Sequence, residues 1–217
     1  MGTITRSFAN NLTTGGVLKA DAFNNASLNN VTALNAAIAT GNMVLLSSQT
    51  ASASASISFT TGIDSTYKEY VFYFINIHGG TDDKGLTVGF RDGGTDYDAI
   101  KTSTAFYAYH EEDGTASALN YSVGLDLSQS TSFQRIGGDA GNDNDQSTSG
   151  YMHLFNPSST TYVKHFIAVA NCPTATNQTL NSFVAGYCNV TAAIDAVQFK
   201  MSSGNIDDGT ILMYGIK

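Results

Sequence analysis

The chain has 217 residues, of which 42% are hydrophobic and only 13% are charged, and its formal net charge is −8. Its ten basic residues are scattered, which argues against a nucleic-acid-binding protein, because such proteins cluster Lys and Arg. No apolar run of about 18 residues predicts a membrane helix, and the first residues lack the basic and apolar regions of a secretory signal. We therefore expect a globular body with a neutral, hydroxyl-rich surface.

The first segment, residues 1–42, is rich in Asn, Ala and Thr and is predicted to be an arm or anchor with one short helix. Between Asp21 and Thr40, apolar residues recur at the spacing of a helix. The stripe that they form consists of Leu28, Val31, Leu34 and Ile38. Asn and Thr are weak helix formers, so this stripe needs a packing partner. Its own domain, symmetry-related copies and a larger assembly all remain candidates.

From Met43 onward the apolar period becomes that of β-strands, with short turns rich in Gly, Asn, Asp and Ser. The expected strands span 43–48, 67–78, 86–91, 97–109, 119–127, 133–136, 151–155, 161–170, 182–188, 193–201 and 210–216. Residues 49–58 alternate Ala and Ser, which predicts a half-exposed extended segment. Because no helix alternates with these strands, residues 43–217 are predicted to form an antiparallel β-sandwich or jelly roll, and Rossmann and TIM-barrel folds are excluded.

The segment 67–78 is apolar on both faces. Its alternation places Tyr70, Phe72 and Phe74 on one side. The opposite side carries Val71, Tyr73, Ile75 and Ile77. This pattern predicts a central strand that is covered on both sides. By contrast, Val197, Phe199 and Met201 alternate with polar residues, which predicts a strand with one wet face.

The sequence offers few residues suited to metal binding or catalysis. Cys172 and Cys188 are not at the spacing of a zinc or redox motif, so free thiols are favoured, with a disulfide as the alternative. The four histidines form no metal-binding motif, and His153 and His165 lie inside apolar strands, which indicates structural roles. Nucleotide-binding loops and nucleophile elbows are absent from the sequence. We therefore expect a protein without a cofactor and without enzymatic activity.

Acidic loops are the remaining candidates for chemistry. In residues 137–147, Asp139, Asp143 and Asp145 are suitable oxygen ligands for Ca²⁺, although their spacing is not that of an EF-hand. A solvated loop is the favoured interpretation, and calcium binding is the alternative. Further acids lie at 91–98 and 111–114. Paired carboxylates are what a glycosidase needs, so a polysaccharide depolymerase stays open as a further hypothesis.

Several segments after residue 43 carry a family resemblance. They are SSQTASASASISF at 47–59, the strand at 67–78, GYMHLFNP at 150–157, TYVKHFIA at 161–168, FVAGY at 183–187 and AIDAVQFKMSSGNIDDGTILMYGIK at 193–217. In these segments the chain resembles a family of structural proteins from marine phages, chiefly those that infect cyanobacteria. The resemblance covers residues 43–217 and brings no catalytic motif with it. It implies a virion component, assembled in the host cytoplasm, on the head or on the tail.

The resemblance leads us to expect a capsid decoration protein or head fibre whose partners are other virion proteins and, by analogy, a homotrimer. The arm at 1–42 is expected to bind the particle, and the body at 43–217 to face solvent. The alternative is a tail-fibre module that binds a host-surface glycan through aromatic side chains near loop tips. The candidate glycan contacts are Tyr97, Tyr107, Tyr109 and Tyr121.

Val31→Asp and Leu34→Asp test the arm, because each variant places a charge on the apolar stripe. We expect both variants to lose attachment, which is measured as the amount of protein that sediments with purified particles. If both variants decorate particles as well as the wild type does, the arm is not the anchor.

Overall fold

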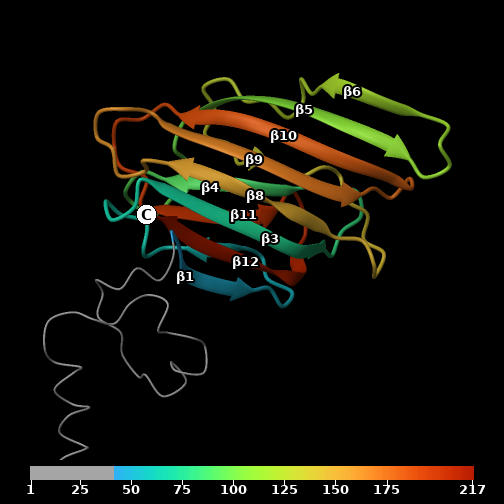
Figure 1. Ribbon diagram of the computed structural model, residues 1–217, viewed down its shortest axis with the longest axis horizontal. Coiled ribbons are helices and arrows are strands. Elements are labelled where there is room, and N and C mark those ends of the chain that lie inside the picture. Colours follow the sequence, from blue (N-terminus) through green and yellow to red (C-terminus); the bar gives the residue numbers. More distant parts are fainter. Residues whose placement is uncertain (1–41) are drawn as a thin grey trace, which may run out of the picture. The chain divides into compact units, whose positions relative to one another are not determined.

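The computed structural model describes residues 42–217, which form an all-β body built from two antiparallel sheets (Figure 1). Twelve strands make up this described part of the chain. They are β1 (Met43–Thr50), β2 (Ile57–Phe59), β3 (Glu69–Gly79), β4 (Leu86–Arg91), β5 (Lys101–Glu111), β6 (Ser117–Tyr121), β7 (Gln134–Arg135), β8 (Thr148–Phe155), β9 (Lys164–Pro173), β10 (Gln178–Cys188), β11 (Ala196–Met201) and β12 (Ile206–Ile216). Each predicted strand overlaps an observed strand, with shifts at its ends, but only residues 119–121 of the predicted strand 119–127 lie in β6. Strand β2 is not predicted, because its residues fall at the end of the segment that is expected to be half-exposed, whereas Ile57 and Phe59 are buried.

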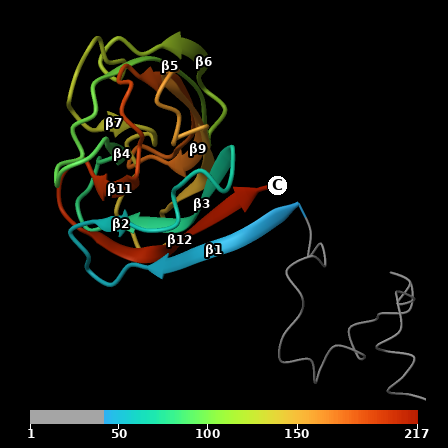
Figure 2. The same cartoon turned by 90° about the vertical axis from the view of Figure 1, so that its left-hand side faces the viewer.

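The larger sheet has eight strands in the order β1-β12-β3-β8-β9-β10-β5-β6, and the smaller has four in the order β2-β11-β4-β7. Strands β8, β9 and β10 are neighbours in both the sequence and the sheet, whereas β3, β4 and β5 alternate between the two sheets. Figure 2 shows the smaller sheet on one side and the larger sheet curving past it. The larger sheet is thus the wider layer, and its β5–β6 end extends beyond the smaller sheet.

The inner faces of the two sheets share one apolar core. Phe199 of β11 lies with its ring centroid 5.4 Å from that of Phe72 and 5.2 Å from that of Phe74, both on β3. Phe59 on β2 joins this cluster at 6.2 Å from Phe199. All four rings are buried. Tilted and edge-to-face pairs add stability beyond the area that they bury, so this cluster ties the two sheets together.

Strand β3 is apolar on both faces, as the sequence predicts, but its two faces meet different surroundings. Phe72 and Phe74 enter the core, whereas Ile75 on the other face is 43% exposed. Within residues 42–217 the outer side of β3 is therefore covered only in part, because Val71 on that side is buried and Ile75 is not. Ile77 also departs from the predicted alternation, because it is buried in the core. The cause is a β-bulge at Asn76, whose φ of 51° shifts the register before Ile77.

Strand β11 confirms the predicted strand with one wet face. Val197 and Phe199 are fully buried, and the polar residues between them point to the opposite side of the sheet. There the Lys200 ammonium lies 4.0 Å from the centroid of the Phe133 ring, which is a cation–π contact. The outer face of the smaller sheet is thus partly polar, as is usual for a solvated antiparallel sheet.

The predicted arm helix, with its stripe of Leu28, Val31, Leu34 and Ile38, lies outside the described residues and stays a prediction. Within residues 42–217 no helix is long and apolar enough to cross a membrane.

Phe199→Ala tests the role of the aromatic cluster. We expect it to lower the free energy of unfolding by about 3–5 kcal/mol, because it leaves a cavity where the two sheets meet. Urea denaturation measures the change. Tyr162→Ala is the control, because Tyr162 is 69% exposed in the β8–β9 connection and should change stability by less than about 0.5 kcal/mol. Equal effects of the two substitutions would show that Phe199 does not join the sheets.

Candidate interaction surface

The outer face of the larger sheet carries a row of residues that crosses all eight strands and is apolar on every strand except β1; we call it the apolar row. The pairing register places one residue of each strand beside the next. From β1 to β6 the row consists of Ser48, Leu212, Tyr73, Tyr151, Val169, Phe183, Phe106 and Tyr121. An antiparallel sheet with one solvated face usually alternates apolar and polar residues, with the polar ones outward. This face departs from that rule.

Large side chains of this face are accessible to solvent. Phe106 is 42% exposed and Tyr151 is 38% exposed. Phe106 stacks on Phe183 with ring centroids 4.8 Å apart, and Tyr151 meets Tyr73 at 6.4 Å. Further exposed apolar residues on the same face are Leu45, Ile75, Leu119, Tyr121 and Ile167. Contiguous apolar patches of this kind are typical of surfaces that bind another molecule. We call it the outer face.

Charged residues are kept away from the middle of the outer face. In residues 42–217 every Asp, Glu, Lys and Arg lies in a connection or within two residues of a strand end. At the margin of the face, Glu69 of β3 pairs with His153 of β8. The same part of the chain holds 17 acids and eight bases, so its formal net charge is −9. The strand ends are therefore acidic, while the face between them is uncharged.

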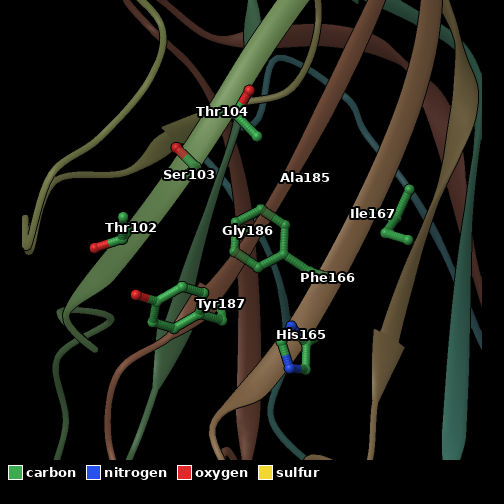
Figure 3. A pocket seen from close by; sticks show the side chains of 9 residues that line it. All are labelled: Thr102, Ser103, Thr104, His165, Phe166, Ile167, Ala185, Gly186 and Tyr187. Carbon is green, nitrogen blue, oxygen red and sulfur yellow. The ribbon is translucent and has the colours of Figure 1, made fainter.

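A hollow of about 490 Å³ lies in the outer face between β5, β9 and β10 (Figure 3). Ala185 and Gly186 of β10 are among the residues that line it. Its walls include Thr102, Thr104, His165, Ile167 and Tyr187. Glycine is needed at 186 because a Cβ there would lie 2.8 Å from the Phe166 ring and 2.6 Å from a main-chain carbonyl oxygen. The hollow gives the apolar face a recess that a partner's side chain can fill.

A second hollow, of about 500 Å³, lies at the end of the larger sheet that extends beyond the smaller sheet. Tyr107 and Tyr109 line it from β5, with ring centroids 6.4 Å apart. Strand β7 and the residues after it contribute Arg135 and Asp139. The rest of the lining includes Leu125, Gln178, Leu180 and Ser182. We call this hollow the tyrosine cleft.

The charges of the tyrosine cleft balance one another. The Arg135 guanidinium pairs with the Asp139 carboxylate, and Arg135 Nε donates a hydrogen bond to the Gly137 carbonyl oxygen at 3.2 Å. Burial lowers the pKa of the Arg135 guanidinium below its ordinary value. The Ser182 hydroxyl is buried, with no hydrogen-bond partner among residues 42–217. The cleft therefore offers donors and acceptors without a net formal charge.

The structure separates the four tyrosines that the sequence suggests as glycan contacts. Tyr107 and Tyr109 share the tyrosine cleft, whereas Tyr121 belongs to the apolar row of the outer face. Tyr97 lies in the β4–β5 connection and lines neither site. Arg135 is not predicted from the sequence as a site residue, because a single arginine in a two-residue strand forms no recognisable pattern.

The three aspartates of the calcium hypothesis lie in different surroundings. Asp139 belongs to the tyrosine cleft, and Asp145 lines a separate polar hollow beside His78. The Asp143 carbonyl oxygen accepts a hydrogen bond from the Gln146 N–H at 2.8 Å. In the part of the chain that the structure describes, no three His, Cys, Asp or Glu side chains are placed to hold a metal ion.

Cys172 and Cys188 are free thiols, and both are buried. Burial raises the pKa of Cys172 to about 11 and that of Cys188 to about 12, from an ordinary value of 9.0. Cys188 is paired in register with Lys101 on β5 and Lys164 on β9, which are buried as well. Burial lowers the pKa of both lysines, and each ammonium group donates to a main-chain carbonyl oxygen, at 2.6 and 2.8 Å.

Comparisons with known protein families, with curated proteins and with solved structures found no match.

Cys172→Ala tests the buried thiols through the pH dependence of stability. Above about pH 9 the unfolded chain releases a thiol proton that the folded chain retains, so the free energy of unfolding falls as pH rises toward 11. We expect the free energy of unfolding of the variant to fall less steeply with pH than that of the wild type. The two slopes should differ by up to about 1.4 kcal/mol per pH unit. Urea denaturation at several pH values measures the slope. Parallel slopes for wild type and variant would mean that Cys172 ionises normally in the folded protein.

Proposed function

We propose that this chain is a non-enzymatic structural protein of a phage particle and that it assembles through the outer face of its larger sheet. The observation that carries the proposal is the apolar row, which is apolar on seven neighbouring strands and includes side chains as exposed as Phe106. Leaving so much apolar surface in water is unfavourable for an isolated protein, whereas an assembled protein buries it. The resemblance of residues 43–217 to phage structural proteins supports placing the assembly in a virion.

A second copy of this chain is the partner that the charges favour. Residues 42–217 of each copy carry a net charge of −9, and the acids lie at strand ends. Two copies that met through these ends would bring like charges together, which is unfavourable. The outer face carries no formal charge between the strand ends of the described sheet, so acidic copies can approach each other closely there.

The size of the outer face suits a stable interface. Eight strands spaced about 4.8 Å apart span about 34 Å, and about six residues of each strand span about 20 Å. The face therefore offers about 700 Å², which approaches the area of about 800 Å² that each partner buries in an interface of standard size. Its apolar middle and charged margin also have the core-and-rim pattern of protein interfaces.

The finer features of the fold belong to the same proposal. We infer a β-sandwich of jelly-roll-like type, because the chain crosses repeatedly between two sheets that share one core. An N-terminal helical arm attaches this body to other virion proteins. Homotrimers are the assembled form, and the capsid is the place of assembly, as a decoration protein or a head fibre. The family resemblance supports a virion component on the head or on the tail, and the trimer rests on analogy with fibres and decoration proteins.

Phe106→Asp and Tyr151→Asp test the assembly face. Each places a carboxylate in the apolar row, where burial in an interface is strongly unfavourable. We expect the wild-type chain to sediment as an oligomer, with a trimer as the predicted size, and both variants to sediment as monomers in analytical ultracentrifugation. Tyr162→Asp is the matched control, because Tyr162 is exposed in the β8–β9 connection, outside the apolar row. The Tyr162→Asp variant should sediment with the same oligomeric mass as the wild type.

Salt provides a second check on the same samples. Ions screen the repulsion between acidic strand ends, so association of the wild type should strengthen as the NaCl concentration rises. The proposal is contradicted if the wild type stays monomeric at every salt concentration. It is equally contradicted if Phe106→Asp and Tyr151→Asp associate as the wild type does.

A further inference from the structure

We propose that the tyrosine cleft binds a neutral saccharide. Tyr107 and Tyr109 alternate along β5 with residues of the outer face, so they project from the opposite side of the larger sheet. Covering the outer face would therefore leave the cleft accessible. The inference goes beyond the assembly proposal and stands on the chemistry of the cleft alone.

Two aromatic rings supply the apolar part of the site. The rings of Tyr107 and Tyr109 are 6.4 Å apart with an angle of 31° between their planes, and both are partly buried. Packing holds the rings in place and leaves part of each accessible. A sugar ring presents C–H groups on its faces and hydroxyls at its edge. Such a ligand can pack its apolar face on the tyrosines while its hydroxyls reach the surrounding polar groups.

The polar groups around the rings match the needs of sugar hydroxyls, which both donate and accept hydrogen bonds. The Asp139 carboxylate can accept hydrogen bonds, and the Arg135 guanidinium can donate them. The Gln178 amide nitrogen already donates to Glu111 Oε1 at 3.1 Å and has a second N–H that a ligand can use. Bonds to charged partners are the stronger kind. Because Arg135 and Asp139 neutralise each other, an acidic sugar gains no net attraction. These polar groups therefore favour a neutral ligand over an acidic one.

The size and the depth of the cleft agree with a small polar ligand. Its volume of about 500 Å³ lies within the range of about 300–1,000 Å³ that is usual for ligand sites. Ser182 contributes to the lining and is only 2% exposed, and its hydroxyl has no hydrogen-bond partner among residues 42–217. A buried hydroxyl without a partner is unfavourable, so its position here indicates a polar ligand.

The cleft suits binding better than hydrolysis. Hydrolysis of a glycosidic bond usually needs two carboxylic groups on opposite sides of that bond. Asp139 is the one acidic residue among those of the described chain that line the cleft, and it is paired with Arg135. The arrangement therefore recognises a saccharide without cleaving it by paired carboxylates.

Saturation-transfer-difference NMR on the full chain tests the site. The probes are the methyl glycosides of glucose, galactose, mannose and N-acetylglucosamine, with sialic acid as the acidic comparison. We expect saturation transfer to a neutral probe and none to sialic acid. Tyr109→Leu and Asp139→Asn should each weaken that binding about tenfold, because they remove an aromatic face and a charged acceptor. Tyr162→Leu is the matched control and should bind as the wild type does.

A titration of the unmodified protein keeps the test independent of variant folding. Ring protons of Tyr107 and Tyr109 should shift as the neutral probe is added. Four outcomes overturn the proposal: no transfer to any neutral probe, preference for sialic acid, ring-proton shifts at Tyr97 or Tyr121 instead, or unchanged binding by folded Tyr109→Leu and Asp139→Asn.

Discussion

The eight-stranded sheet packs on a narrower four-stranded sheet that covers only one of its faces, and both candidate sites follow from this two-layer arrangement. In the middle, the aromatic cluster around Phe199 fills the space between the sheets. At the β5 end the larger sheet continues where the smaller one has ended, which leaves room for the tyrosine cleft. On the other side, residues 42–217 provide no further layer, so the apolar row remains accessible.

The distribution of charge gives the outer face its specificity. Acids at the strand ends disfavour most ways in which two copies can meet, and the uncharged face is the exception. In the proposed assembly, the acidic ends of the sheet therefore act against unwanted association, and the uncharged face is the surface that copies share. Two of the eight bases, Lys101 and Lys164, are buried, and Arg91 and Arg135 pair with acids, so few cations remain to neutralise the strand ends.

The sequence predicts the strands well because turns and apolar alternation are local properties. It predicts the one wet face of β11 for the same reason. The pattern of β3 is ambiguous, because a strand buried on both sides and a strand that keeps one face for a partner are both apolar throughout. The bulge at Asn76 could not be foreseen either, since Asn is common in ordinary turns.

The tyrosine cleft is harder to predict than the strands because it is built from distant parts of the chain. The sequence suggests Tyr107 and Tyr109 as glycan contacts from their residue type and their place near predicted loop tips. Their partner Arg135 lies in β7, which is too short to show any period. Strand order decides that these residues meet, and no local pattern encodes that order. Tyr121 shares their residue type but lies on the opposite face of the sheet.

Cryo-electron microscopy of the assembled protein tests whether copies of this chain meet through the outer face of the larger sheet. If copies assemble through the outer face, Phe106 and Tyr151 are covered by another copy of this chain and the tyrosine cleft is open to solvent. A reconstruction in which the apolar row faces solvent, with the copies joined through their acidic strand ends, would contradict it.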